Sequence, residues 1–376
     1  MRRNNDEFAL IWADMIRGLS VLCVMVHHWF LFLPGRSGYA FLSQSVDFVQ
    51  TVGGTFVHLF FFLSGYGLAA SYFNSNDFSW HSWSARRIRK IIVPYWIFIT
   101  ATFLLVNSAH WVSAQQFGSH YSFLSLFCYA TFTRNFYPPC WDFNPTFWFM
   151  PVIFGLYLLF PILLWLLKKC GVRTFILVSV LITYGSILLF LLFGYEIVHN
   201  TALPFFFISP FAIGMALALT LKRQVHFLAK LSSPYALLLG VGFYFSSWLL
   251  IHAWDQGSTF NDTLTTAGLI FMCIPACKFV FHVFPGRFTD ILTFCSKHSY
   301  LMYLLHGALI LYVIKPVLQS AFPDGPDLLV LTGLAGFYVV AVTFLAAALY
   351  RPVKALSGLV FGEYWGSAVV VNSVKP

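Results

Sequence analysis

Residues 9–33 read ALIWADMIRGLSVLCVMVHHWFLFL, an apolar run that is long enough to cross a lipid bilayer as a helix. Three ionisable residues, Asp14, Arg17 and His28, lie inside this run. A charged residue near the centre of a spanning helix costs roughly 2.5–3.5 kcal/mol on insertion scales, so such residues usually face a protein interior or a water-filled cavity. We therefore treat this predicted helix as a candidate functional site.

The spacing of the three residues places them on one stripe. From Arg17 to His28 the helix makes about three turns, so the two side chains share a face and lie about 16 Å apart along the axis. Asp14 precedes Arg17 by one turn, so its carboxylate is expected to hold the guanidinium. His27 points about 100° away from His28 and is expected to pack or bond between helices. His28 either bonds within the bundle or acts as a general base, and its register with Arg17 favours the second role.

The composition decides the class of protein. Hydrophobic residues make up 59% of the chain and charged residues 9%, whereas soluble domains have about 25% charged residues. We expect an all-α polytopic membrane protein. The net charge of +9 comes from short Lys and Arg clusters between apolar runs, which is typical of topology signals rather than of a nucleic-acid-binding surface. The seven cysteines show no CxxC pair or zinc spacing, so no metal site is expected, and a Cys128–Cys140 disulfide stays open.

About ten spans of apolar residues are predicted, forming one membrane domain over residues 1–376 without an appended soluble domain. Most basic residues between spans fall on the side of the N-terminus, and only Arg36, Arg134 and Lys315 fall on the other side. The positive-inside rule then places both termini in the cytoplasm. The predicted spans are 9–33, 49–73, 91–108, 146–167, 174–194, 203–221, 235–254, 262–284, 299–314 and 327–350.

The predicted outer loop 107–145 is rich in aromatic residues, among them Trp141. Its centre, YSFLSLFCYATF, is apolar but too short to cross a bilayer, so it is expected to be re-entrant or interfacial. The aromatic side chains form either a belt at the lipid headgroups or a stacking platform for sugar rings.

A basic cluster in WSARRIRKIIVPYW (83–96) contains Arg86 and Arg89 at helical i, i+3 spacing. For a single member, a topology anchor that reaches lipid phosphates explains the charge at least as well as a binding site does. Taken together, clustered guanidinium groups suit the phosphates of a nucleotide-like donor arriving from the cytoplasm.

Two further spans contain polar residues. The second has His58 and Ser64 beside glycines, which favour close helix packing, and these two side chains are candidates to line the same cavity as His28. In the ninth, Tyr303 and His306 share a stripe that either bonds between helices or lines a cavity.

Four motifs in this order resemble the acyltransferase 3 family of integral membrane O-acyltransferases, typified by bacterial enzymes that modify surface polysaccharides. The first is D14-M15-I16-R17-G18 together with His28, with ten residues between Arg17 and His28, and the others are FVHLFFFLSGYGL (56–68), ARRIRKIIVPYW (85–96) and KHSYLMYLLHGAL (297–309). The similarity extends over nearly the whole chain. It departs from the family at Leu349 and Tyr350, where a Glu often precedes the Arg-Pro pair, and this puts a site role for Arg351 in doubt.

The resemblance implies an enzyme of the bacterial inner membrane that transfers an acyl group, acetyl in the first instance, from cytoplasmic acetyl-CoA to a hydroxyl of a surface polysaccharide or lipid-linked glycan. It implies that His28 is catalytic, that Arg17 and Asp14 organise the site, and that Arg86 and Arg89 help to hold acyl-CoA, with no metal required. The rival hypotheses are a transporter or flippase for a lipid-linked glycan, and transfer of succinyl or a longer acyl group. The residues expected to contact the acceptor are Ser64, His58, Trp141, Tyr303 and His306.

Overall fold

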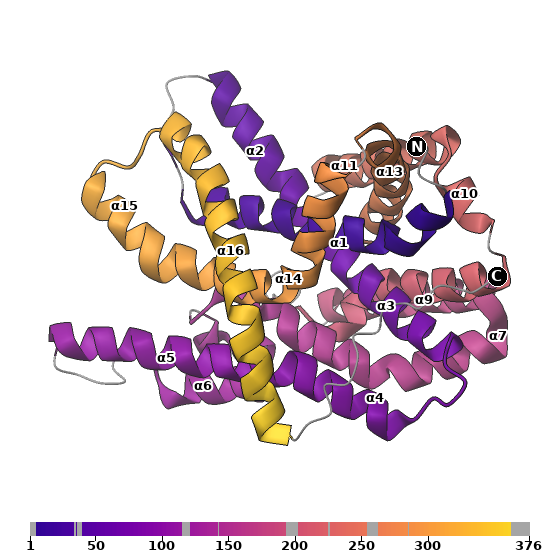
Figure 1. Ribbon diagram of the computed structural model, residues 1–376, viewed down its shortest axis with the longest axis horizontal. Coiled ribbons are helices and arrows are strands. Elements are labelled where there is room, and N and C mark those ends of the chain that lie inside the picture. The colour runs from indigo at the N-terminus through magenta and orange to yellow at the C-terminus, as the bar shows by residue number, and fades with distance from the viewer. Residues whose placement is uncertain are drawn as a thin grey trace. The chain divides into compact units, whose positions relative to one another are not determined.

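The computed structural model describes residues 5–33, 35, 40–114, 121–141, 143–192, 202–224, 226–253, 262–284 and 286–361. Within these residues every regular element is a helix and no β-strand occurs, as the all-α prediction requires (Figure 1). The contacts divide the chain into two compact units. The first unit comprises Met1–Ser20, Thr55–Asn76 and Trp148–Ser296, and the second comprises Val21–Gly54, Asp77–Phe147 and Lys297–Pro376.

The first unit is a bundle of packed helices in which α11 and α13 run side by side (Figure 1). Its elements are α3 (Val57–Phe73), α7 (Phe149–Leu192), the 3-10 turn η5 (Pro204–Phe207), α9 (Ile208–Arg223), α10 (Phe227–Leu231), α11 (Pro234–Ala253) and α13 (Asp262–Val283), with the first parts of α1 (Asn5–Phe32) and α14 (Arg287–Leu309).

Close approach of two backbones holds α3 against α9. A Cβ atom built on Gly65 would lie 2.0 Å from the carbonyl oxygen of Phe211, so only glycine fits there. Beside this contact the rings of Phe61 and Phe207 pack with their centroids 4.7 Å apart. The expected packing role of the glycines in the second span is therefore confirmed at Gly65, whereas Gly67 has no neighbour within 4 Å of such a Cβ.

The longest helix, α7, is broken at Gly171. Its 44 residues would extend about 66 Å as one helix, roughly twice the hydrocarbon thickness of a bilayer. Gly171 has φ 75° and ψ 172°, a conformation that only glycine adopts readily, and it interrupts the helical path. The break lies between the two predicted spans 146–167 and 174–194.

The second unit contains the remaining elements, two of which are π-helical turns that interrupt longer helices. Tyr95 and Phe147 pack edge to face in its core, with centroids 5.5 Å apart, and Tyr129 packs against Phe143 in the same way. The elements are α2 (Ala40–Thr55), α4 (Trp80–Arg87), the π turn η1 (Ile88–Ile92), α5 (Val93–Ala114), α6 (Phe123–Ala130), the 3-10 turns η2 (Arg134–Phe136), η3 (Pro138–Cys140) and η4 (Pro145–Trp148), the π turn η6 (Ile310–Ile314), α15 (Lys315–Ala321) and α16 (Leu328–Phe361), with the remaining parts of α1 and α14.

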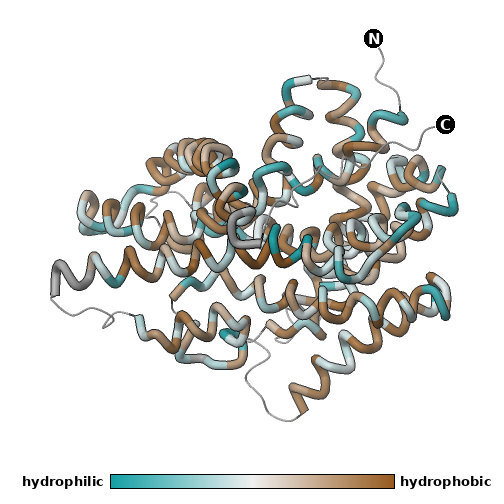
Figure 2. The backbone as a smooth tube through the Cα atoms, turned by 60° about the horizontal axis from the view of Figure 1, so that its bottom comes forward, coloured by the Kyte–Doolittle hydropathy of each residue, from teal (hydrophilic) through white to brown (hydrophobic). Residues whose placement is uncertain are grey.

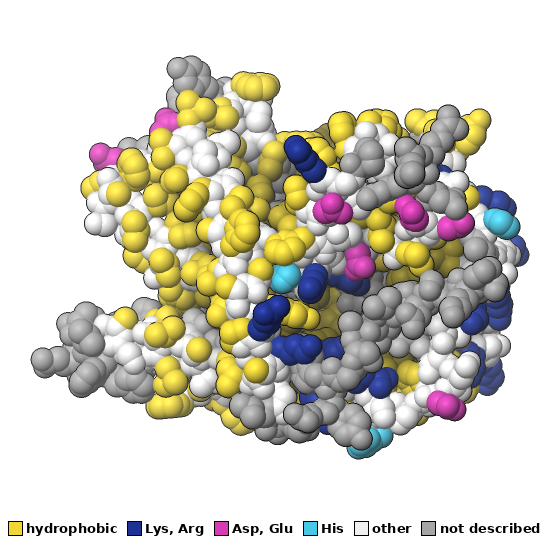
Figure 3. All heavy atoms as spheres, in the orientation of Figure 1, with side chains coloured by type: hydrophobic (Ala, Val, Ile, Leu, Met, Phe, Trp, Pro, Cys, Tyr) yellow, Lys and Arg dark blue, Asp and Glu magenta, His cyan; other side chains and the backbone are white. Residues whose placement is uncertain are grey.

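Eight of the helical stretches in the described residues are long and apolar enough to cross a membrane. Figure 2 shows long brown, hydrophobic runs along the tube, and Figure 3 shows hydrophobic side chains over much of α16 on the face in view. On α16 the side chains of Phe337 and Phe344 are 74% and 66% exposed, which in water would be an aggregation hazard and in lipid is expected. The count of ten spans and the position of the termini stay predictions.

Several helices extend beyond the predicted spans. Helix begins at Ala40 rather than near residue 49, and a continuous helical path runs from Trp80 to Ala114 around the predicted span 91–108. The prediction followed hydropathy, but polar residues continue a helix past the apolar part because the backbone hydrogen bonds do not depend on hydropathy. The helix ends and the ends of the apolar segment are therefore different boundaries.

Candidate active site

In the first unit, Asp14 and Arg17 form the expected ion pair on α1. Nη1 of Arg17 donates to Oδ1 of Asp14 over 2.8 Å. The same oxygen accepts a hydrogen bond of 2.9 Å from the hydroxyl of Ser296 on α14. The carboxylate, one helical turn before Arg17, thus holds the guanidinium in place. It also joins α1 to α14 through Ser296.

In the second unit, His28 on α1 meets His306 at the end of α14. Nε2 of His306 lies 3.2 Å from Nδ1 of His28, and the ring centroids are 4.9 Å apart. Phe32, one turn after His28, stacks on the His28 ring at 5.5 Å. The structure therefore brings together two of the residues that the sequence singled out in separate motifs.

The hydrogen bonds of the two rings allow one neutral arrangement of their protons. Nδ1 of His28 lies 3.0 Å from the carbonyl oxygen of Val24, and Nδ1 of His306 lies 2.6 Å from that of Tyr303. A carbonyl oxygen only accepts, so both Nδ1 atoms must carry hydrogen. The one hydrogen on Nδ1 of His28 is then shared between the carbonyl oxygen of Val24 and Nε2 of His306, and Nε2 of His28 keeps its lone pair.

His306 is held rigidly by its surroundings. Its side chain is buried, and its own carbonyl oxygen accepts a hydrogen bond of 3.2 Å from Tyr338 of α16. One turn earlier, the hydroxyl of Tyr303 donates to the carbonyl oxygen of Thr146 over 3.1 Å. The π turn η6 starts four residues after His306, and such turns are frequent at functional sites. The sequence left two interpretations of this stripe, bonding between helices and lining a cavity. Both side chains bond other elements: Tyr303 bonds Thr146 of η4, and His306 bonds His28 of α1.

His27 behaves as the helical register predicts. Its Nδ1 lies 2.6 Å from the carbonyl oxygen of Gln50 on α2, so the ring bonds between helices. It also packs against Gly54, where a Cβ would lie 2.8 Å from its ring. This makes His27 a natural comparison for its neighbour His28.

The predicted outer loop folds around Arg134, and Trp141 is part of that framework. The indole N–H of Trp141 donates to the carbonyl oxygen of Arg134 over 2.9 Å, and Nη2 of Arg134 donates back to the carbonyl oxygen of Trp141 over 3.2 Å. The guanidinium also lies 5.4 Å from the centroid of the Tyr129 ring. A contact of Trp141 with an acceptor sugar stays a prediction, and its polar groups already bond within the loop.

Two buried donors in this part of the second unit lack a partner among the described residues. They are Nε of Arg134 and the side-chain nitrogen of Asn144. The side-chain oxygen of Asn144 accepts from the hydroxyl of Thr146 over 2.7 Å, and Thr146 in turn bonds Tyr303 through its carbonyl. Unpartnered buried donors of this kind suit an acceptor atom of a ligand.

The basic cluster on α4 and η1 is joined by a basic residue of α16. Arg86 of α4 is exposed, and Arg89 of the π turn η1 is half-buried. The hydroxyl of Tyr300 donates to the carbonyl oxygen of Ile91, which ties α14 to the π turn. Lys354 of α16 lies within electrostatic range of Lys90. The cluster is thus larger than the sequence motif alone.

Ser64 and His58 lie on α3 in the first unit. Ser64 is half-buried and precedes Gly65, the point of closest contact with α9. His58 is buried, and its Nε2 lies 3.4 Å from Oδ1 of Asp262, the first residue of α13. The predicted cavity shared by these two side chains and His28 stays a prediction.

A family model for an acyltransferase domain, that of acyltransferase 3, matches residues 10–351. The chain belongs to the acyltransferase 3 family. Membership supports membrane-bound acyl transfer in general. The match includes all four motifs on which the resemblance rested.

Among curated proteins, this acyltransferase 3 chain is similar to the O-acetyltransferase PaAT-1 of Phomopsis amygdali, with 37% identity over 65 residues, which are 15% of this chain. The chain covers 13% of the length of that relative. No solved structure matches the chain.

Sequence reasoning about this acyltransferase 3 chain missed Asp262, Asn144 and the burial of Arg134. Arg134 was noted only as an exception to the charge asymmetry. That exception was the available signal, because a basic residue on the side with few positive charges needs another reason to be there.

Proposed function

We propose that the protein transfers an acetyl group from cytoplasmic acetyl-CoA to a hydroxyl of a surface polysaccharide or of its lipid-linked precursor. We propose the bacterial inner (plasma) membrane as its location. The observation that carries the proposal is the His28–His306 pair, in which the hydrogen bonds leave the lone pair on Nε2 of His28.

In the proposed step, Nε2 of His28 accepts the proton of the acceptor hydroxyl while the oxygen attacks the thioester carbonyl. The C–O bond forms and the C–S bond breaks. The thiolate of CoA leaves and takes the proton from the imidazolium, so that the products are the ester and CoASH. No net proton is consumed. His306 orients the imidazole of His28, and its own Nδ1 remains on the carbonyl oxygen of Tyr303.

The donor is assigned to the basic cluster around Arg86 and Arg89. The phosphates of CoA carry several negative charges, and guanidinium groups bind them through charge-assisted hydrogen bonds. Lys90 of the same π turn and Lys354 of α16 add further positive charge. Arg17 lies about 16 Å from His28 along α1, so it shapes the cavity or meets the pantetheine arm rather than the reacting atoms.

Acetylation of the glycan in membrane vesicles, with label in the acetyl group of acetyl-CoA, tests the proposal. His28→Ala is expected to lower the rate by roughly 10²- to 10⁴-fold, the usual contribution of a general base. His27→Ala removes an adjacent imidazole whose hydrogen bond is to Gln50, so it is the matched control. Both variants must be present in the membrane in equal amount. Full activity of the His28 variant would show that the assigned role is wrong.

The acyl group and the acceptor are tested by mass spectrometry of surface glycans from cells with and without the gene. A fixed mass difference identifies the acyl group, and a difference larger than acetyl would favour succinyl or a longer chain. The similarity to the O-acetyltransferase PaAT-1 of Phomopsis amygdali supports acetyl, over the short stretch that is similar.

A transporter or flippase is the rival from another class, because an interior polar stripe suits transport as well. Binding of CoA to the detergent-solubilised protein, weakened in Arg86→Ala/Arg89→Ala, favours the enzyme. Arg173→Ala/Arg223→Ala removes the same charge from two exposed positions elsewhere and is expected to leave binding unchanged. Flux of a glycan lipid without CoA would favour transport instead.

A further inference from the structure

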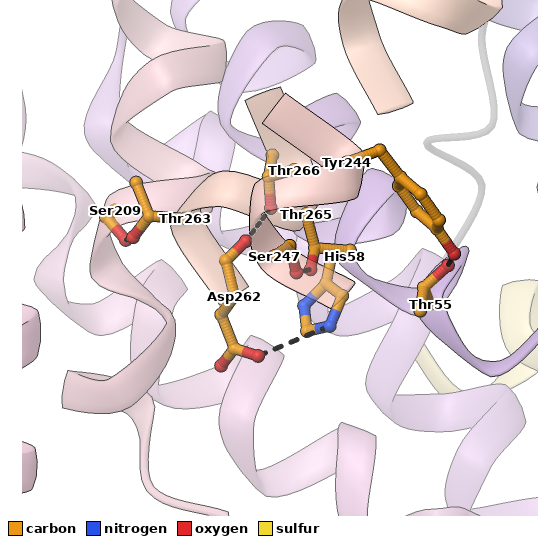
Figure 4. A network of polar contacts seen from close by, with 9 residues as sticks. All are labelled: Thr55, His58, Ser209, Tyr244, Ser247, Asp262, Thr263, Thr265 and Thr266. Carbon is orange, nitrogen blue, oxygen red and sulfur yellow. Dashed lines mark hydrogen bonds and ion pairs between the residues drawn. The ribbon is translucent and has the colours of Figure 1, made fainter. Parts of the chain in front are cut away.

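The first unit contains a second imidazole site that the proposed reaction does not use. His58 of α3 and Asp262 of α13 meet there, with Nε2 of the ring 3.4 Å from Oδ1 of the carboxylate (Figure 4). Burial of both groups is incomplete: the side chains are 11% and 14% exposed. On one face the ring stacks against Phe207, with centroids 6.3 Å apart. The pair is therefore held in place, and a small part of each side chain remains exposed.

Among the described residues, the second nitrogen of this ring has no hydrogen-bond partner. Nδ1 of His58 is buried and makes no hydrogen bond with any described residue. His58 as a whole is 8% exposed. An unsatisfied buried polar atom costs about 1–3 kcal/mol, so such an atom normally has a partner from outside the chain.

The hydroxyl groups around the pair already bond one another, as Figure 4 shows. Ser247 meets Thr265 at 2.6 Å, and Thr266 donates to the carbonyl oxygen of Asp262 over 2.7 Å. Two further pairs lie on neighbouring elements, Ser209 with Thr263 at 2.6 Å and Thr55 with Tyr244 at 3.2 Å. These hydroxyl groups therefore bond one another or the backbone, and none of them bonds Nδ1 of His58.

We propose that His58 and Asp262 form a binding site for the hydroxyl group of an alcohol, held through Nδ1 of His58. With the carboxylate ionised, Nε2 donates to Asp262 and Nδ1 accepts. With the carboxyl group protonated, the roles of both nitrogens reverse. A hydroxyl group donates and accepts, so it satisfies Nδ1 in either arrangement, whereas an ammonium only donates and a carbonyl only accepts.

The His58–Asp262 pair also has the chemistry of a carboxylate and an imidazole that polarise an alcohol in general-base catalysis. There the carboxylate orients one ring nitrogen, and the other ring nitrogen faces the O–H group. Water offers the same O–H group, and the experiment must separate the two sources. The small exposed fraction of the pair favours a single hydroxyl of a flexible or extended ligand over a bulky group inserted whole.

The test uses the full chain in nanodiscs of phosphatidylcholine, a lipid without hydroxyl groups, with ¹⁵N in the histidine rings. The probe is methyl β-D-glucopyranoside, and its fully O-methylated derivative is the matched probe without O–H donors. The His58 resonances are assigned by their loss in His58→Gln. We expect a saturable shift of the Nδ1 resonance with the first probe and none with the second, with affinity about tenfold weaker in Asp262→Asn.

No acyl-CoA is present in this experiment, so its outcome does not depend on the proposed acyl transfer. An Nδ1 resonance that stays constant up to the highest probe concentration would mean that an ordered water only occupies the site, and the inference would be wrong. An equal shift with the O-methylated probe, or equal affinity in the folded Asp262→Asn protein, would overturn it as well. His27→Gln, which alters a ring bonded to a backbone carbonyl, is the control and is expected to bind as the unchanged protein does.

Discussion

His306 occupies both of its ring nitrogens with other groups, one on the carbonyl oxygen of Tyr303 and one on His28. Neither nitrogen is left to react, so its contribution is to the orientation and the tautomer of His28. The same contacts explain why a neutral imidazole is stable in this buried place: each Nδ1–H has a carbonyl acceptor. His306 is thus a positioning residue for the proposed base.

We predict that His306→Leu lowers kcat of acyl transfer by roughly 10- to 100-fold, since a small misplacement of a catalytic group can cost about 10². In His306→Gln the side-chain oxygen can accept from Nδ1 of His28 in the place of Nε2, so activity should return to within a few-fold. Rates of both variants at saturating acetyl-CoA provide the measurement. A loss that the Gln variant does not relieve would mean that His306 itself exchanges a proton during turnover.

The Cys140 thiol in the predicted outer loop is unreactive on physical grounds. Burial raises its pKa to about 12, and its Sγ donates weakly to the carbonyl oxygen of Leu124. Because thiolate is the reactive form, the thiol stays protonated and inert from pH 7 to pH 9 and ionises only as the pH approaches its raised pKa. Cys128 and Cys140 are both free thiols in the structure, so the disulfide that the sequence left open is not formed there.

We predict that a maleimide at pH 8 alkylates the exposed Cys170 of the detergent-solubilised protein and leaves Cys140 unmodified until the chain is denatured. Peptide mass spectrometry after labelling distinguishes the two cysteines. Rapid labelling of Cys140 in the folded protein would contradict the burial described here. If the maleimide labels neither Cys128 nor Cys140 even after the chain is denatured, the two cysteines form a disulfide in the isolated protein.

At the scale of elements, the helices that carry the site could be predicted and their partners could not. The Asp14–Arg17 pair follows from local spacing alone, because helical geometry fixes which residues three apart meet. His28 and His306 are 278 residues apart, and His58 and Asp262 belong to different helices, so only the packing of the chain joins them. Periodicity shows which face of a helix is polar, but it does not show which other helix covers that face.

The packing of α3 on α9 leads to a prediction about stability. Gly65→Ala would place a methyl group 2.0 Å from the carbonyl oxygen of Phe211, so the helices must separate. Such overpacking costs about 1–3 kcal/mol, and we expect a lower temperature of unfolding by tryptophan fluorescence in detergent. Gly67→Ala adds the same atom two residues later, where nothing lies within 4 Å, and is expected to be neutral or slightly stabilising. Equal stability of both variants would disprove the close approach.

For the whole molecule, hydropathy and charge predicted a helical membrane protein, and the described residues agree. They contain eight helices of sufficient length and apolar character, and the Gly171 break in α7 accounts for one difference from the predicted count of ten. The helix α11 has a shorter apolar part, Pro234–Leu250, which hydropathy alone counted as a full span. Composition is informative at this scale because the bilayer acts on every residue of a span, whereas a site depends on a few contacts.

The orientation of the chain in the membrane decides which side supplies the acyl donor to the basic cluster. The charge asymmetry places Cys170 and the Arg86–Arg89 cluster in the cytoplasm and the loop around Tyr137 outside. In intact cells a membrane-impermeant maleimide should label a Tyr137→Cys variant, because this side chain is 43% exposed, and should not label Cys170. Inside-out vesicles should reverse the result. The opposite pattern would put the basic cluster out of reach of cytoplasmic CoA and would refute the proposed donor, whatever the role of His28.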